Sequence, residues 1–244
     1  MLRLVAFYAA ALLAEVAGTV GGFGSSVFFV PLAQLLLGVK AALAVTGAFH
    51  VFSNLAKLGL FRHGIAWRLV VLVGGPSVGL VVVGAYLSSR VQGPVIQLLL
   101  GVFLVGFAGV FLRWPTVQLR PTATNAVAGG AAAGLLAGLT GTGGAVRGLS
   151  LAAFNLEKNV FVATSAAIDL AVDLSRTVVY VQQGYLPRQY WGYVLGLVGV
   201  AFVGSYLGKR ILDRLPQPVF RRLVLLLLLV IGVATLAGAL RQLL

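Results

Sequence analysis

Two stretches of this chain, AGTVGGFGSS at residues 17–26 and AGLTGTGGAV at residues 137–146, decide the fold. Each lies in a long apolar run and interrupts it with a cluster of glycines. Glycine lets the backbone leave a helix, and unwound backbone inside a bilayer occurs where it lines a cavity. Matching breaks in two halves of a membrane protein indicate the substrate site of a secondary transporter.

The composition indicates a polytopic helical membrane protein. The chain has 244 residues, of which 60% are hydrophobic and 9% are charged, and its mean hydropathy is +1.04. Apolar stretches of about 18 or more residues follow one another almost without interruption, which is typical of membrane-spanning helices. The apolar runs are continuous rather than alternating, and this disfavours a β-barrel.

The charge and cysteine counts restrict the partners. The net charge is +13, but most Lys and Arg residues stand at expected helix ends, where lipid headgroups account for them. We therefore expect a lipid bilayer and a small anionic substrate as partners and no nucleic acid, and we leave a homo-oligomer open. The absence of cysteine excludes disulfides and thiolate metal sites. No cofactor or metal is expected.

An internal repeat organises the chain. The block VGAYLSSR at 83–90 matches VGSYLGKR at 203–210, with the same offset of 120 residues as the glycine clusters. We predict a first transmembrane repeat at 1–114, a linker at 115–120 and a second repeat at 121–244. The expected helical segments are 3–20, 22–38, 41–61, 67–88 and 94–112, then 122–140, 143–155, 159–181, 188–208 and 218–240.

The number of membrane passes in each repeat decides how the repeats are related. Five passes invert the second repeat, whereas four would leave the repeats parallel. Counting Lys and Arg on the two sides favours five passes, with both termini outside. The sequence leaves open whether each glycine-broken pair forms two full spans or one span with a re-entrant arm.

The glycine motifs, with Val30-Pro31 after the first and Ala163-Thr164-Ser165 after the second, resemble those of the sulfite exporter TauE/SafE family, also called the toluene sulfonate uptake permease family. The resemblance covers nearly the whole chain. It implies a multi-pass protein of the prokaryotic cytoplasmic membrane that carries sulfite, sulfonates or organic acids. The first motif departs from the usual glycine triplet, and Arg147 after the second is atypical.

The glycine breaks supply the first candidate site residues. Free N–H groups at the start of the following half-helix form an anion site, and hydroxyl groups add donors. The alternative is close helix crossing without a ligand, which we expect for Gly18 and Gly138. The expected substrate-binding residues of the breaks are Gly21, Gly22, Gly24, Ser25, Ser26, Gly141, Thr142, Gly143 and Gly144.

Polar residues inside two apolar segments supply the remaining candidates. Asp169, Asp173 and Arg176 share one helical face, and the repeat offers His50, Asn54 and Lys57 at the same spacing. Charges within a bilayer usually face a cavity and pair with one another. We assign Asn54, Lys57 and Arg176 to substrate binding.

Four further groups are expected to couple protons or form ion pairs: Glu15, His50, Asp169 and Asp173. An unperturbed imidazole exchanges its proton near neutral pH. We expect Asp173 to pair with Arg176, and Glu15 to be protonated or to pair with Arg147 or Lys57. The alternative is a set of structural salt bridges that lock the helices together.

The sequence thus predicts a secondary transporter rather than an enzyme, moving a small sulfur-containing or organic anion by alternating access, with a proton link. One alternative is an anion channel or a small membrane scaffold. Another is an intramembrane serine protease, with Ser26 in the Gly24-Ser25-Ser26 motif and His50 as its base.

Overall fold

The computed structural model describes residues 2–61, 64–88, 90, 94–114 and 122–243. In these ranges the chain is helical and has no strand, and every expected segment corresponds to one helix. The expected linker at 115–120 lies outside the described residues. The helices are α1 (Leu2–Gly21), α2 (Ser26–Leu37), α3 (Val39–Leu60), α4 (Trp67–Leu87), α5 (Pro94–Arg113), α6 (Ala123–Thr140), α7 (Gly144–Ala153), α8 (Lys158–Gln182), α9 (Trp191–Asp213) and α10 (Gln217–Leu243), with a short 3-10 helix, η1 (Arg188–Tyr190), before α9.

The glycine clusters end the first helix of each half. After α1, Gly22 and Gly24 have φ angles of 73° and 91°, and after α6, Gly141 has a φ angle of 75°. Side chains other than glycine rarely adopt these angles. The chain therefore leaves α1 and α6 at glycine and turns into α2 and α7.

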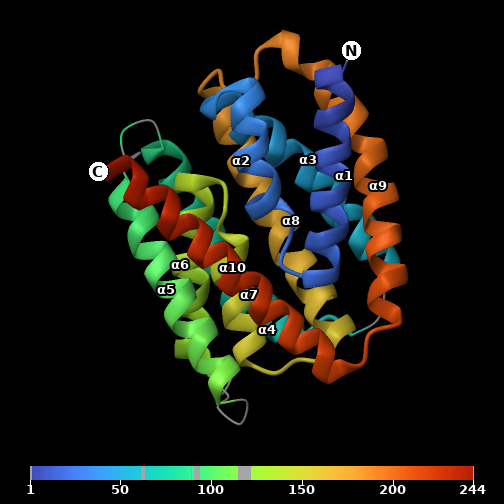
Figure 1. Ribbon diagram of the computed structural model, residues 1–244, viewed down its shortest axis with the longest axis vertical. Coiled ribbons are helices and arrows are strands. Elements are labelled where there is room, and N and C mark those ends of the chain that lie inside the picture. The colour runs from blue at the N-terminus through green and yellow to red at the C-terminus, as the bar shows by residue number, and fades with distance from the viewer. Residues whose placement is uncertain (1, 62–63, 89, 91–93, 115–121, 244) are drawn as a thin grey trace.

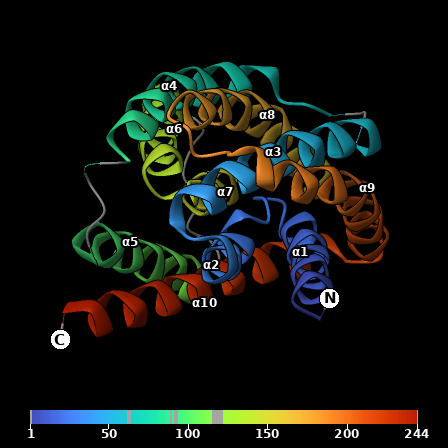
Figure 2. The same ribbon diagram turned by 90° about the horizontal axis from the view of Figure 1, so that it is seen from above.

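The helices that follow the breaks are half-length. At 1.5 Å per residue, the 12 residues of α2 extend about 18 Å and the 10 residues of α7 about 15 Å. The hydrocarbon core of a bilayer is about 30 Å thick, so neither helix can cross it alone. In Figure 2, α7 lies in the middle of the bundle, whereas α2 packs on α1 and α3 and leaves Leu35 exposed.

Six helices among the described residues are long and apolar enough to cross a membrane: α1, α3, α4, α6, α9 with η1, and α10. The 25-residue α8 is equally long, but it carries Asp169, Asp173 and Arg176 on its buried face. The chain is therefore an all-helical, polytopic membrane protein.

Small residues hold the peripheral helices close together. Gly130, Gly134 and Gly138 of α6 recur every fourth residue, and a Cβ at each would lie 2.2–2.3 Å from a backbone oxygen of α4. On the other side, Gly204 and Gly208 of α9 accommodate side chains of α1. Such small-residue contacts allow close packing of membrane helices. The helix-crossing interpretation of Gly138 is thus confirmed.

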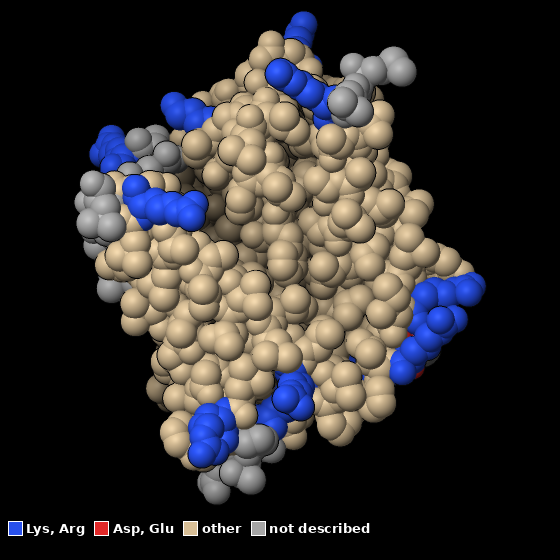
Figure 3. Space-filling model, viewed as in Figure 1, with Lys and Arg blue, Asp and Glu red and all other residues tan. Residues whose placement is uncertain are grey.

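The long helices pack in pairs around a polar centre. α1 packs against α9, α4 against α6, α5 against α10, and α3 against α8 in the middle (Figure 1). On the face shown in Figure 3, Lys and Arg gather toward the ends of the molecule, and a broad belt without charged side chains separates them. This distribution suits a bilayer around the belt, while the buried polar side chains lie between α1, α3, α7 and α8.

Candidate functional site

The two glycine breaks meet inside the bundle. Gly144, the first residue of α7, packs so closely on the first break that a Cβ would lie 2.3 Å from the Phe23 carbonyl oxygen. Because α2 and α7 both begin here, the positive ends of two helix dipoles point toward the same place. One hollow is lined by residues of both breaks, namely Phe23, Gly24, Ser26, Gly141, Gly143 and Gly144.

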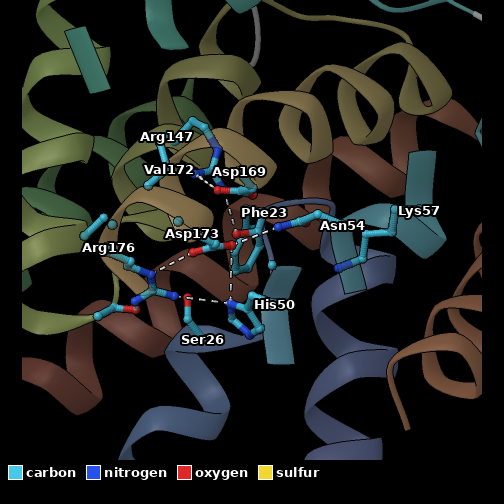
Figure 4. Close-up of a pocket in the computed structure, with 15 residues that line it drawn as sticks. Phe23, Ser26, His50, Asn54, Lys57, Arg147, Asp169, Val172, Asp173 and Arg176 are labelled. Atoms are coloured by element: carbon cyan, nitrogen blue, oxygen red, sulfur yellow. Dashed lines mark hydrogen bonds and ion pairs between the residues drawn. The ribbon is translucent and has the colours of Figure 1, made fainter. Parts of the chain in front are cut away.

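The hollow is nearly closed in this conformation. Its volume is only about 10 Å³. That is room for roughly one water molecule. The rest of its wall comes from α3, α6, α7 and α8, through His50, Asn54, Lys57, Ala137, Arg147, Asp169, Val172, Asp173 and Arg176 (Figure 4).

The polar faces of α3 and α8 contact each other across the hollow. Asn54 Nδ2 donates to Asp173 Oδ2 at 2.8 Å, and Arg176 Nε donates to Asp173 Oδ1 at 2.8 Å. The expected pair of Asp173 with Arg176 is therefore present. All three side chains are buried, so their charges and dipoles are compensated mainly by one another.

A second buried ion pair links α7 to α8. Arg147 Nη1 and Nη2 engage the two carboxylate oxygens of Asp169, and this fork-to-fork arrangement is the strongest geometry for such a pair. Arg147 Nε also donates to Ser165 Oγ at 3.3 Å. Arg147 was expected only as an atypical residue of the motif and as a candidate partner of Glu15, but it lies in the hollow and pairs with Asp169.

Each arginine also holds the carbonyl oxygen of one glycine break. Arg147 Nη2 donates to the Phe23 carbonyl at 3.1 Å, and Arg176 Nη1 donates to the Gly141 carbonyl at 3.0 Å. Carbonyl groups that have lost their helical partners must be satisfied inside a bilayer. The two arginines therefore stabilise the unwound backbone as well as the carboxylates.

Glu15 lies beside the hollow in a cluster of its own. Its Oε1 accepts from Lys57 Nζ at 2.9 Å and its Oε2 accepts from Ser25 Oγ at 2.6 Å. Of the two partners expected for Glu15, the structure shows Lys57. Three more hydroxyl groups donate to Oε1, those of Thr19, Ser53 and Ser205.

Ser25 connects this cluster to His50. The Ser25 hydroxyl has a single hydrogen, and with that hydrogen on Glu15 its oxygen accepts from His50 Nε2 at 2.8 Å. The other ring nitrogen, Nδ1, then accepts from Arg176 Nη2 at 3.5 Å. Both contacts are satisfied by a neutral imidazole. A proton added at Nδ1 would face Asp173 Oδ2, which is 3.8 Å away.

The buried charges in and beside the hollow are balanced. Lys57, Arg147 and Arg176 carry three positive charges, and Glu15, Asp169 and Asp173 carry three negative ones. With His50 neutral, the formal sum is zero. No group of three or more His, Asp or Glu side chains in the described part of the chain is arranged to hold a metal ion.

Several expected site residues lie away from the hollow. Gly21 faces Leu227 and Phe23, Gly22 faces Phe161, and the Thr142 hydroxyl pairs with Thr140. A role of Gly21, Gly22 and Thr142 in substrate binding remains a prediction, and their positions outside the hollow do not support it. Thr19, Ser53, Ser165 and Ser205 were not among the expected site residues, although Thr19 and Ser165 stand in the quoted motifs. Serine and threonine are common in membrane helices, so their presence alone does not indicate a polar cluster.

The comparisons with known proteins give one match. A family model described as sulfite exporter TauE/SafE matches residues 7–235, which include both glycine breaks and every residue of the hollow. No curated protein and no solved structure matched the chain. The match implies a membrane transporter of the exporter type for sulfite or related sulfur-containing anions, and the six long apolar helices agree with it. The chain belongs to the sulfite exporter TauE/SafE family.

Proposed function

We propose that the protein is a secondary transporter of the prokaryotic cytoplasmic membrane that carries a small sulfur-containing anion, such as sulfite or a sulfonate, together with protons. The observation that carries this proposal is the charge-balanced hollow in which both glycine breaks meet. A small organic anion would suit the same groups, because carboxylates and sulfonates present similar oxygens to arginine.

The anion would bind between the arginines and the starts of α2 and α7. Arg176 and Arg147 offer planar forks for oxyanions, Lys57 adds a point charge, and Asn54 and Ser26 add neutral donors. Each arginine now holds a carboxylate. A bound anion would compete for these donors and would release one of the carboxylates.

Charge balance supports the proton link. A monoanion entering a hollow of zero net charge leaves one buried negative charge uncompensated, and buried charge is costly. One proton bound with the anion removes that cost. The acceptors at hand are the released carboxylate, Asp169 or Asp173, and His50 Nδ1, which lies 3.8 Å from Asp173.

The closed hollow supports alternating access. A site with room for about one water molecule cannot exchange a sulfite-sized anion without a conformational change. A permanently open channel does not suit such a site, and the channel alternative therefore loses support.

Inverted repeats would supply that change. Under the repeat, α1 corresponds to α6 and α9 to α4, so the pair α1–α9 exchanges with α6–α4. In the pairs α3–α8 and α5–α10, the two helices of each pair correspond to each other, so the repeat operation leaves these pairs unchanged. The α1–α9 and α4–α6 pairs, each of which joins one helix from either repeat, would then move about the central α3–α8 contact and expose the hollow to each side in turn.

The protease alternative loses support from hydrogen bonding. The serine next to His50 is Ser25 rather than Ser26, and its hydroxyl serves the Glu15 carboxylate. In the arrangement described above, the imidazole donates to Ser25, whereas a nucleophilic serine donates to its base.

The test is a flux screen in proteoliposomes. Sulfite, sulfate, thiosulfate, methanesulfonate and acetate are compared under an imposed pH gradient and without one. We expect saturable flux of at least one sulfur oxyanion that the pH gradient accelerates. Flux that rises linearly with concentration and ignores the pH gradient would contradict the proposal.

A further inference from the structure

A second cavity lies at the end of α8, close to where α3 begins and α4 ends. It is open to the surface, has a volume of about 530 Å³ and is lined by Lys40, Tyr86, Leu87, Arg90, Gln183 and Tyr185. We call it the basic cleft. Two of its six lining residues are cationic and none is acidic. The lining of the hollow, in contrast, carries three cationic and two acidic side chains, and Glu15 beside it balances the third cation. The basic cleft is thus a region of positive potential that attracts anions.

Two stacked tyrosine rings lead inward from the basic cleft. The rings of Tyr185 and Tyr180 lie 5.6 Å apart at an interplanar angle of 12°. Tyr185 lines the basic cleft and is nearly buried, with 4% of its surface exposed, and Tyr180 is fully buried behind it. Lys40 Nζ lies 5.4 Å from the centre of the Tyr185 ring.

Tyr180 in turn adjoins the hollow. It stands one helical turn after Arg176 on α8, about 6 Å along the axis, so both side chains lie on the same face. The Tyr180 hydroxyl donates to the Gly138 carbonyl at 2.5 Å, one turn before the Gly141 carbonyl that Arg176 holds. The two tyrosines therefore link the floor of the basic cleft to the wall of the hollow.

We propose that the basic cleft is a second binding site for small oxyanions, and that the Tyr185–Tyr180 stack closes the passage between it and the hollow. This role rests on the proposed function, because a passage matters only if the hollow binds the anion. The sequence-based count of Lys and Arg, which puts Lys40 and Arg90 on the less basic side, predicts that the basic cleft faces the outside. A sulfur oxyanion would pause there between the hollow and the external solution.

The chain contains no cysteine, so single introduced cysteines report access without a background. Leu87→Cys places a thiol in the basic cleft. Its labelling rates by an anionic (sulfonatoethyl) and a cationic (trimethylammonioethyl) methanethiosulfonate are measured in sealed proteoliposomes. We expect the Lys40→Gln/Arg90→Gln background to lower the anionic-to-cationic rate ratio about tenfold, since two nearby cations act oppositely on the two reagents. Arg3→Gln, which removes a cation outside the basic cleft, is the matched control. An unchanged ratio would overturn the anion site.

A competition experiment distinguishes a free oxyanion in solution from the headgroup of an anionic lipid as the occupant of the basic cleft. Methanesulfonate or sulfate at constant ionic strength should slow the labelling of Leu87→Cys at least about twofold. Phosphatidylglycerol in the vesicles should leave the rate unchanged relative to phosphatidylcholine alone. Protection by phosphatidylglycerol without protection by the free anions would assign the basic cleft to a lipid headgroup and overturn its place on the anion passage.

The stack is tested with a cysteine in the hollow. Val172→Cys should react slowly with the anionic reagent, and Tyr185→Ala should raise its rate at least about tenfold. Tyr86→Ala, which truncates a cleft tyrosine outside the stack, is the matched control. If the alanine variant fails to fold, Tyr185→Leu is used instead, because it keeps an apolar side chain without the flat ring. It should also raise the labelling rate of Val172→Cys.

Neither labelling experiment requires transport, so their failure is distinct from failure of the flux screen. A rate at Val172→Cys that is already fast, or that Tyr185 substitutions do not raise, would contradict the closing role of the stack. If both cysteines are labelled as expected but no saturable flux is found, the result would support the anion site and contradict the proposed function.

Discussion

Arg176 has a structural role and a proposed substrate role, and a double substitution separates them. Its guanidinium donates to Asp173 at 2.8 Å and to the Gly141 carbonyl at 3.0 Å. Arg176→Gln leaves Asp173 as a buried charge with Asn54 as its remaining hydrogen-bond donor. Breaking a buried pair in this way costs about 3–5 kcal/mol. For a chain of this size the midpoint of thermal unfolding should fall by about 10 °C.

The double variant Arg176→Gln/Asp173→Asn removes both charges and keeps the formal sum at zero. Two amides can hydrogen-bond each other, so we expect the free energy of unfolding to recover to within about 1–2 kcal/mol of that of the native protein. Substrate affinity should not recover. A lost charge-assisted fork is worth about 1.5–3 kcal/mol, or roughly 10- to 100-fold in affinity.

The assay combines thermal unfolding of the purified protein with uptake by proteoliposomes at equal protein content. Arg176→Lys should regain part of the affinity, because lysine supplies a point charge without the fork. The exposed Arg188→Gln is the control and should alter neither quantity. Recovery of both stability and affinity in the double variant would refute the reasoning and reduce the pair to a structural salt bridge.

Three further substitutions test the hollow and its supports. In the native protein, methanesulfonate uptake should decline as the pH rises, because a proton must bind with the anion. Asp169→Asn leaves one positive charge uncompensated, so uptake by this variant should no longer decline with pH. An unaltered pH profile would count against charge balance. Ser25→Ala leaves Glu15 Oε2 without its donor and should cost about 1–3 kcal/mol of unfolding free energy, measured by thermal denaturation. Gly144→Ala forces a Cβ to 2.3 Å from a carbonyl oxygen and should abolish uptake, whereas Gly75→Ala, with open space around its Cβ position, should leave uptake intact.

The overall architecture could be predicted from local pattern. The apolar runs, the glycine breaks and the repeated offset give ten helices close to their observed bounds. The shared face of Asp169, Asp173 and Arg176 follows from helical periodicity alone. Periodicity does not show that α2 and α7 are half-length, because an apolar stretch that spans the bilayer and one that turns back share the same composition.

The partners of the buried charges could not be predicted in the same way. Glu15 is satisfied in part by Ser205, which lies 190 residues further along the chain, and serine leaves no periodic trace. Arg147 was expected only as a candidate partner of Glu15, although its side chain reaches both Asp169 and the Phe23 carbonyl. Such contacts depend on how α7 and α9 dock, and a single sequence does not contain that information.

The most direct test of the central claim measures protons and anions in the same vesicles. Proteoliposomes with a pH-sensitive dye in the lumen receive an inward gradient of the anion that the flux screen identifies, with no pH gradient imposed. We predict that the lumen acidifies as the anion enters, saturably and in fixed proportion to it, and that Arg176→Gln/Asp173→Asn slows both movements together. Anion influx without acidification would contradict the claim that the hollow binds the anion and the proton together.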